Sequence, residues 1–213
     1  MAYHAQLAAS GKPLIADMSS NILSRAFNMK HFACVFAGAQ KNIGVSGLTL
    51  VVVQRRYFVP LTERQCPIPS VLDYSKMDKE RSLMHTPNCF AIWVTRLILA
   101  WLQQKGGLQQ QMEENTAKAA CLYDAIDRSE GGFYKGSVAE HCRSRMNVVF
   151  RLGDNDAALE KQFVQEASEK GLTSLAGHRS VGGIRASLYN AVTMDAVKAL
   201  TEFMQDFAHR QLQ

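Results

Sequence analysis

Two side chains in the first fifth of the chain have the types and spacing that could hold an aldehyde cofactor. Lys41 ends an apolar run and lies among small residues in the sequence FACVFAGAQKNIG of residues 32–44. A lysine that forms a Schiff base must spend part of its time as the neutral amine, and partial burial beside other charges lowers its pKa enough to allow this. Asp17 ends a second apolar stretch, just before the turn-forming residues 18–21. An aspartate can pair with a protonated pyridine nitrogen while a lysine carries the aldehyde carbon, so the two residues suit pyridoxal 5′-phosphate (PLP), although a solvated lysine at a strand end is the commoner case.

A second group of side chains, nearer the C-terminus, carries positive charge suited to an anion. His178, Arg179 and Arg185 lie within eight residues, with Gly182 and Gly183 between them. Glycine lets the backbone turn and approach a ligand closely, and arginine binds a carboxylate or phosphate through two parallel hydrogen bonds. The pattern predicts a site for a doubly anionic small molecule, but the same residues could be ordinary surface charge on a loop and a strand edge.

Short apolar runs predict the strands that must position Asp17 and Lys41. Residues 13–17, 32–36 and 47–53 are rich in apolar side chains and are bounded by Gly, Ser, Asn or charge, which is typical of buried strands in an α/β sheet. Residues 55–86 contain several prolines and a long polar stretch, so we expect a loop-rich connection that faces a partner.

Helical periodicity begins near Pro87. We expect a helix there that is ended by residues 105–107 (KGG) and followed by a second helix over residues 108–128. The inward stripe of the first helix is predicted to consist of Phe90, Trp93, Val94, Leu97 and Trp101.

The remaining sequence predicts a small α+β lobe. Side chains alternate over residues 146–152, which indicates a half-buried strand. Asp154 or Asn155 could cap the helix that follows, and Gly171 closes it. We expect short strands at residues 172–175 and 184–189, and then a last helix begun by Thr193.

Composition and charge argue against several other classes of protein. The 213 residues are 47% hydrophobic, and Lys and Arg exceed Asp and Glu by 24 to 19, but the basic residues are scattered, so nucleic-acid binding is disfavoured. The longest apolar run, residues 90–102, is too short to span a bilayer and carries Arg96, so we expect no membrane segment. The five cysteines are widely separated and predict neither a disulfide framework nor a metal site. We expect a cytoplasmic protein, since the N-terminus lacks the basic and apolar pattern of a secretory signal.

Four motifs, in order along the chain, support the PLP hypothesis more strongly than the spacing of Asp17 and Lys41 does. They are residues 16–21 (ADMSSN), 37–44 (AGAQKNIG), 66–74 (CPIPSVLDY) and 177–191 (GHRSVGGIRASLYNA). Together they resemble the phosphoserine aminotransferase family, which belongs to the class V aminotransferases of PLP fold type I. The likeness runs from about Leu14 to the C-terminus. Because four separate motifs match in order, the resemblance is specific to this family rather than to PLP enzymes in general.

The resemblance implies an α/β fold that is part of the PLP-dependent transferase fold type I. Residues 1–105 would be a remnant of the PLP-binding large domain with part of the dimer interface. Residues 106–213 would be the connecting helix and a complete small α+β C-terminal domain. The implied reaction is amino transfer between glutamate and 3-phosphohydroxypyruvate in L-serine biosynthesis.

The resemblance also implies a role for each candidate residue. Lys41 would bond to PLP and act as general base and acid, and Asp17 would keep the ring nitrogen protonated, which makes these two the catalytic residues. Gln40 would contact the cofactor phosphate, and Thr86 would reach the same phosphate from a neighbouring subunit, with His85 beside it. The family resemblance therefore predicts a homodimer with shared active sites.

For the substrate, the resemblance implies that Arg185 holds the α-carboxylate, while His178 and Arg179 face the phosphate. A transaminase acting on a non-phosphorylated acid is disfavoured by this pair.

The chain departs from the family pattern in three places. His85 stands where the family has Asn, and Val45 stands where it usually has Pro, so the loop after Lys41 is expected to be less rigid. The family has a further segment before the part corresponding to Leu14, with a glycine-bearing phosphate turn, an aromatic residue that stacks on the ring, and more substrate-binding arginines. The alternative is therefore a fragment or paralogue that lacks catalysis and acts at most as a pairing subunit.

Overall fold

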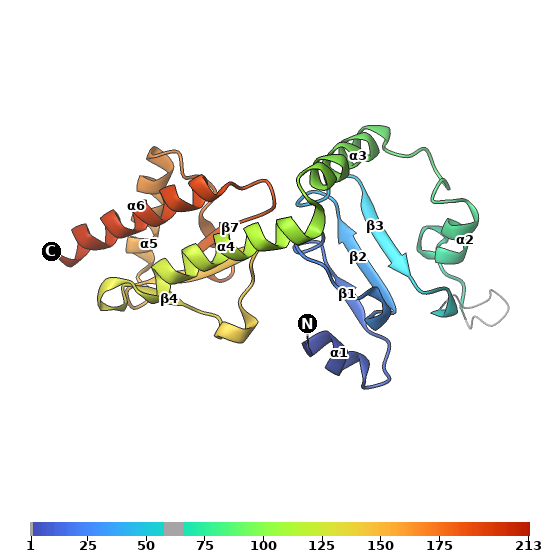
Figure 1. Cartoon of the computed structure of the whole chain (residues 1–213), viewed down its shortest axis with the longest axis horizontal. Coiled ribbons are helices and arrows are strands. Elements are labelled where there is room, and N and C mark those ends of the chain that lie inside the picture. The colour runs from blue at the N-terminus through green and yellow to red at the C-terminus, as the bar shows by residue number, and fades with distance from the viewer. Residues whose placement is uncertain (1, 58–65) are drawn as a thin grey trace. The chain divides into compact units, whose positions relative to one another are not determined.

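The computed structural model describes residues 2–57 and 66–213, which form two compact units, Met1–Gln104 and Lys105–Gln213. Pro60, which belongs to the predicted loop-rich connection, lies outside the described residues. Each unit is described separately below, with the elements labelled in Figure 1.

The first unit contains a small mixed sheet. Strands β1 (Ile15–Asp17) and β2 (Cys34–Gly38) are parallel, and β3 (Thr49–Val53) pairs antiparallel with β2. All three lie where the sequence predicts strands. Around them are α1 (Ala2–Ala8) and the 3₁₀ turn η1 (Met29–His31). A buried cluster supports the strand ends that carry Asp17 and Lys41, and its members are Met18, Ile22, Phe32, Val35, Ala37, Ala39 and Ile43.

The first and third strands are not buried, contrary to the prediction. In β1, Ile15 is 64% exposed and Asp17 is exposed, and in β3 Leu50, Val51 and Val52 are between 37% and 42% exposed. An apolar run predicts that a strand is covered, but it does not identify the surface that covers it.

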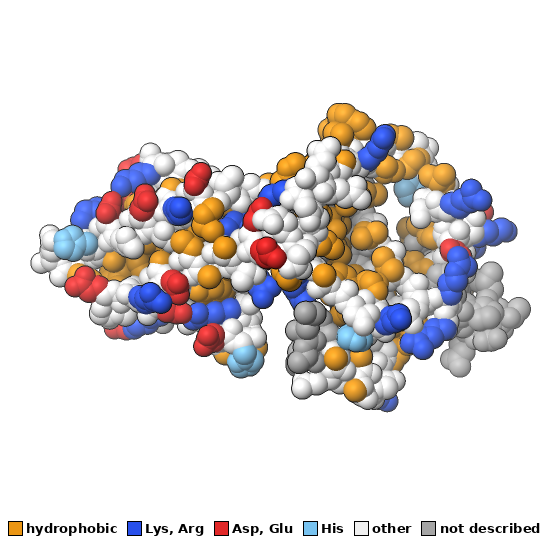
Figure 2. Space-filling view, viewed as in Figure 1, with side chains coloured by type: hydrophobic (Ala, Val, Ile, Leu, Met, Phe, Trp, Pro, Cys, Tyr) orange, Lys and Arg blue, Asp and Glu red, His pale blue; other side chains and the backbone are white. Residues whose placement is uncertain are grey.

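The long helix α3 (Cys89–Gln104) also differs from the prediction in the face that it buries. Ala91 and Leu102 are buried, whereas most of the predicted inward stripe is exposed, with Phe90 at 63% and Trp93 at 54%. The helix is apolar on nearly every side, so periodicity could not single out one face. Figure 2 shows many hydrophobic side chains on the surface of the body that carries α3 and β3.

The connection before α3 is only partly a loop. It contains the 3₁₀ turns η2 (Arg55–Tyr57) and η4 (Ser70–Leu72) and the helix α2 (Tyr74–Lys79). Asp73 caps α2, because its Oδ1 accepts hydrogen bonds from the backbone N–H groups of Ser75 and Lys76. This helix was not predicted, because six residues are too few to show a helical apolar periodicity.

The second unit is an α+β lobe built on one antiparallel sheet of order β4-β5-β7-β6. Its elements are α4 (Gly107–Asp127), η5 (Glu130–Gly132), β4 (Tyr134–Gly136), η6 (Glu140–Cys142), β5 (Asn147–Leu152), α5 (Ala157–Glu169), β6 (Ala176–His178), β7 (Gly182–Ser187) and α6 (Met194–Leu212). The core is aromatic: Phe163 lies within 6.1 Å, ring centre to ring centre, of Tyr134, Phe150, Phe203 and Phe207.

Most helix and strand predictions for this unit are confirmed, but β4 was not predicted, and β7 begins and ends two residues before the predicted strand at residues 184–189. Smaller corrections concern the cap of α5 and the start of β6. Thr193 caps α6 as expected, since its Oγ1 accepts from the N–H of Ala196. The cap of α5 is Asp156 rather than Asp154 or Asn155. The predicted strand at residues 172–175 begins later, at Ala176, because Ser174 has a left-handed backbone.

Candidate active site

Asp17 stands at the C-terminal end of β1 and turns the chain there. Its Oδ1 accepts from the backbone N–H of Ser19 at 2.8 Å and from the hydroxyl of Ser19 at 2.6 Å. An aspartate that accepts from the N–H two residues later forms an Asx turn, which explains why the strand ends at this point. The hydroxyl and backbone hydrogen bonds from Ser19 lower the pKa of Asp17, and the positive charge of Lys41 adds to this.

Lys41 lies in the turn that follows β2, the neighbouring parallel strand. Its Nζ donates to Oγ of Ser20 at 2.6 Å, and the side chain is partly buried. Ser20, which accepts from Lys41, directly follows Ser19, which donates to Asp17, so consecutive serines hold the two predicted catalytic residues. The structure therefore brings together an amine and a carboxylate that are separated by 24 positions in the sequence.

Ser19 joins the two turns. Its Oγ, which donates to Asp17, also accepts from the backbone N–H of Gly38 at 3.0 Å. A Cβ on Gly38 would lie 2.6 Å from Oε1 of Gln40, so a side chain there would displace the amide of Gln40. The exposed amide of Gln40 thus folds back over the end of β2, beside Lys41.

The turn that carries Lys41 is held from several sides. Buried Asn42 donates to the carbonyl oxygen of Ile22 at 3.0 Å, and the N–H of Gly44 donates to the carbonyl oxygen of Ala39 at 2.7 Å. A Cβ on Gly44 would lie 2.9 Å from Oγ1 of Thr95 in α3, so this turn packs closely against the helix. These contacts surround the segment that precedes Val45.

Ser19 and Ser20 were not among the predicted site residues, although their hydrogen bonds hold both catalytic candidates. The pattern Asp-x-Ser was a local signal for the Ser19 contact, because Asx turns are short-range structures. No local signal marked Ser20, whose partner is 21 positions away.

These residues suit the ring nitrogen and the aldehyde of PLP, and they offer one donor for its phosphate. The cluster lies at the carboxyl ends of parallel strands, where open α/β sheets bind their ligands. The ionised carboxylate of Asp17 suits a protonated ring nitrogen, and the primary amine of Lys41 suits an aldehyde. For the phosphate, the amide of Gln40 offers a hydrogen-bond donor beside the amine.

His85 and Thr86 lie in the same unit, between α2 and α3, and both are exposed. Nδ1 of His85 is 3.0 Å from the carbonyl oxygen of Thr86. Their predicted contact with a cofactor phosphate of a neighbouring subunit stays a prediction.

The predicted anion site lies in the second unit, at the turn between β6 and β7. His178 is exposed, and its Nδ1 accepts from the backbone N–H of Ser180 at 3.3 Å. With Nδ1 as an acceptor, the neutral ring carries its proton on Nε2, which can donate to an anion. Arg179 follows directly in the exposed turn.

Arg185 lies further along β7 and on the other face of that strand. His178 pairs with Gly182 and Ala176 pairs with Ile184, so the alternation of a strand directs Arg185 to the opposite side. Nε of Arg185 is buried and has no hydrogen-bond partner among the described residues. A buried donor left in this way suits an acidic ligand group.

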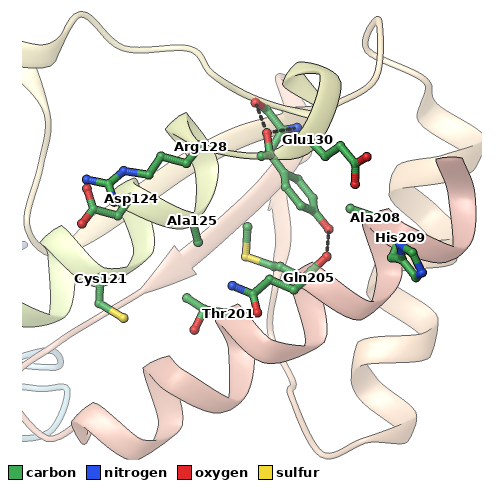
Figure 3. Close-up of a pocket in the computed structure, with 12 residues that line it drawn as sticks. Cys121, Asp124, Ala125, Arg128, Glu130, Thr201, Gln205, Ala208 and His209 are labelled. Carbon is green, nitrogen blue, oxygen red and sulfur yellow. Dashed lines mark hydrogen bonds between the residues drawn. The ribbon is translucent and has the colours of Figure 1, made fainter.

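A separate pocket of about 380 Å³ lies between α4 and α6 (Figure 3), and none of the predicted site residues lines it. Its walls include Asp124, Arg128 and His209. The hydroxyl of Tyr134 donates to the carbonyl oxygen of Met204 at 2.8 Å at this place, and burial strongly raises the pKa of Tyr134.

Residues 2–57 and 66–213 are the part of the chain that the structure describes. This part of the chain has no group of three or more His, Cys, Asp or Glu side chains that could hold a metal ion. It also has no helix with the length and apolar character needed to cross a bilayer. All five cysteines are unpaired in the structure.

Comparison with known proteins gives consistent matches. The family model described as Aminotransferase class-V matches residues 4–200. The curated phosphoserine aminotransferase of Herpetosiphon aurantiacus is 47% identical over 95% of this chain and 54% of its own length. The chain thus spans about half the length of the curated relatives that it matches.

Solved structures agree with the predicted fold class. The phosphoserine aminotransferase from Bacillus circulans subsp. alkalophilus is similar with a TM-score of 0.87 at 45% identity, covering 93% of this chain and 54% of that one. The PLP-bound phosphoserine aminotransferase from Trichomonas vaginalis gives a TM-score of 0.83 at 38% identity, covering 91% and 53%. The prediction of an α/β fold of the PLP-dependent transferase type is confirmed.

Proposed function

Because the chain belongs to the class-V aminotransferase family, we propose that it acts in phosphoserine transamination, the transfer of an amino group between glutamate and 3-phosphohydroxypyruvate in L-serine biosynthesis. Its cofactor would be PLP. The observation that carries this proposal is that the consecutive residues Ser19 and Ser20 bind Asp17 and Lys41, which follow the carboxyl ends of the parallel strands β1 and β2. The names of the relatives at 46–48% identity support the choice of substrate.

In this proposal the first unit supplies the proton chemistry. PLP, when bound, would supply an electron sink for negative charge at the substrate α-carbon. Asp17, whose pKa lies below its ordinary value, would stay ionised and hold the proton on the ring nitrogen. Nζ of Lys41 would take the proton from the α-carbon of the amino donor and return it to complete the transfer. Ser20, 2.6 Å from Nζ, would orient the amine.

The second unit would bind the substrate through its positive charges. Nε of Arg185, a buried donor without a partner in the described residues, suits the α-carboxylate. His178 and Arg179 would bind the phosphate, with Nε2 of His178 as a donor.

We also propose a homodimer with shared active sites. His178 pairs with Gly182, and Gly182 and Arg185 belong to opposite faces of β7. This arrangement favours a dimer in which His178 and Arg185 of one chain serve different active sites. The exposed apolar side chains of α3 and β3 supply surface for association. Light scattering coupled to size-exclusion chromatography tests this: a 23.7 kDa species at micromolar concentration would contradict it.

The cofactor role of Lys41 can be tested without turnover. The chain is incubated with PLP and reduced with borohydride, which fixes a lysine-bound pyridoxyl group, and the labelled peptide is identified by mass spectrometry. We expect the label on Lys41 and its loss in Lys41→Ala, with Lys30→Ala, an exposed lysine of the same unit, as the control. A label that persists elsewhere in Lys41→Ala at wild-type yield would contradict the assignment.

A pairing subunit without catalysis is the second candidate, and the exposed apolar surface of the first unit favours it. Turnover of glutamate and 3-phosphohydroxypyruvate by the purified chain with PLP would exclude it. Comparing phosphorylated with plain 3-hydroxypyruvate in the same assay would test the predicted preference for a phosphate.

A further inference from the structure

A buried ion pair from two other elements holds the turn that carries His178 and Arg179. Arg151 in β5 donates from Nε to Oε1 of Glu160 in α5 at 2.7 Å. The side chain of Glu160 is 8% exposed, and that of Arg151 is 24% exposed. Burying such a pair is costly unless further hydrogen bonds satisfy it. The other partners of the pair therefore indicate what it is placed to hold.

Those partners are backbone groups of the turn. Nη1 of Arg151 donates to the carbonyl oxygen of Val181 at 2.9 Å. Oε2 of Glu160 accepts from the backbone N–H of Gly183 at 3.1 Å. The ion pair thus holds the backbone on both sides of Gly182, and within the turn the N–H of Val181 donates to the carbonyl oxygen of His178 at 2.9 Å.

Glycine allows the turn to approach Arg151 this closely. Gly183 has a φ of +75°, and a Cβ there would lie 2.8 Å from Cδ of Arg151 and 3.0 Å from the carbonyl oxygen of Phe150. Gly182 has a φ of +76°, and a Cβ there would meet the guanidinium of Arg151 at ordinary contact distance. Neither backbone conformation suits a residue with a side chain. The close contact therefore depends on glycine in the turn and on arginine in β5.

We propose that Arg151 and Glu160 are positioning residues, which hold the His178–Arg179 turn in the conformation that receives the phosphate group of the substrate. This rests on the proposed function, in which His178 and Arg179 bind that phosphate. An exposed turn that must be ordered on binding loses affinity, and a turn ordered beforehand avoids the loss. Glu160 also neutralises Arg151, so the positive charge offered to an anion is that of Arg179.

The test is phosphate recognition by the full 213-residue chain, measured without turnover. Backbone amide resonances are followed by NMR while O-phospho-L-serine or L-serine is added. We expect O-phospho-L-serine to shift the resonances of residues 178–183 with saturation, and L-serine to leave them unchanged. If O-phospho-L-serine shifts none of them in the wild-type chain, the phosphate role in the proposed function is wrong and this inference falls with it.

Two variants test the positioning itself. Arg151→Gln and Glu160→Gln should each weaken binding of O-phospho-L-serine about tenfold, because the turn must then be ordered on binding. Arg210→Gln is the matched control: it also removes one positive charge and one 2.7 Å ion pair with a glutamate of α5, Glu166. The control should bind within about twofold of wild type. If the wild type binds and both test variants bind equally well, the positioning inference is wrong while the proposed function stands.

A conservative variant keeps the test informative if removal of the charge prevents folding. Arg151→Lys preserves the charge opposite Glu160, but a single ammonium cannot reproduce the two-armed geometry of the guanidinium. We expect it to fold, as judged by circular dichroism, to exchange the Gly183 amide hydrogen faster than wild type, and to bind O-phospho-L-serine several-fold more weakly. Wild-type affinity in a folded Arg151→Lys chain would overturn the role of the Val181 contact.

Discussion

The two units of this chain differ in how far their large apolar side chains are buried. In the second unit, aromatic rings of β4, β5, α5 and α6 enclose one another, and Phe163 and Phe207 are fully buried. Among the described residues, every exposed large hydrophobic side chain except Val181 and Leu212 belongs to the first unit. The second unit therefore has a core that its own residues complete, whereas the first presents an apolar surface of the kind that binds another protein surface.

The proposed chemistry is divided between the same two units. The proposed proton chemistry belongs to the unit with exposed apolar surface, and the proposed anion recognition belongs to the unit with the closed core. A closed core can hold a binding turn in place by itself. The turn that carries Lys41 is held by hydrogen bonds within its own unit, but the apolar side chains of β3 and α3 in that unit stay exposed.

The largest expected effect comes from truncating the closed core. Phe163→Ala should lower the free energy of unfolding of the second unit by about 3–5 kcal/mol, because a fully buried ring leaves a cavity. Trp93→Ala, which removes a ring that is 54% exposed, should change the stability of the first unit by less than about 1 kcal/mol. Hydrogen exchange of peptides from residues 105–213 and 66–104, measured in increasing urea, would report the two units separately. Similar costs for both substitutions would remove the contrast.

A buried polar contact provides a sharper test of the same unit. Lys118 in α4 is 2% exposed, and its Nζ donates to the carbonyl oxygens of Leu188, Tyr189 and Val192 at 2.9–3.2 Å. Burial lowers the pKa of Lys118 to about 8, and the charge of Lys105 adds to this.

Lys118→Met should therefore destabilise the second unit by about 3 kcal/mol, because it leaves buried carbonyl groups without partners. Lys161→Met, at an exposed position of α5, is the control and should be within about 0.5 kcal/mol of wild type. Urea unfolding followed by the same hydrogen-exchange peptides measures both. Equal stability of the two variants would show that the three hydrogen bonds contribute little.

The smallest expected effect is a pH dependence at the surface of the second unit. Arg143 binds Asp127 through two hydrogen bonds of 2.6 and 2.7 Å, which hold the pKa of Asp127 below its ordinary value. The folded state then favours the ionised form, so this contribution is present above about pH 4 and is lost as the pH falls through the lowered pKa.

Asp127→Asn should accordingly lose less stability than wild type between about pH 4 and pH 2. Asp206→Asn, at an exposed carboxylate of α6, is the control. Thermal unfolding at a series of pH values gives the comparison. A pH profile of Asp127→Asn that runs parallel to wild type would contradict the assignment.

Much of the second unit could be predicted because its information is local. Alternation marked β5, spacing by three and four marked α5 and α6, and Thr193 marked the start of the last helix. The predicted position of the α5 cap was wrong because Asp154, Asn155 and Asp156 can all cap a helix. Only the backbone path shows that Asp156 is the cap.

The first unit was harder to predict, since its surfaces depend on what lies against them. The apolar pattern of α3 indicated a helix, but a helix that is apolar on most sides does not reveal which stripe faces its own sheet. The prediction placed Phe90 and Trp93 inside, and both are exposed. Exposure on β3 was missed for the same reason, because an apolar run does not say which partner covers it.

The candidate site shows the same division between local and distant information. The sequence by itself determined the types of residue, the Asp-x-Ser turn at Asp17, and the glycines that allow the turn at residues 182–183, because these depend on neighbours within a few positions. Tertiary structure alone decided that Lys41 meets Ser20 beside Asp17, and that Arg151 and Glu160 hold the turn after His178. Such contacts join residues 21 to 30 positions apart, and their geometry is set by strand pairing and packing rather than by any periodicity along the chain.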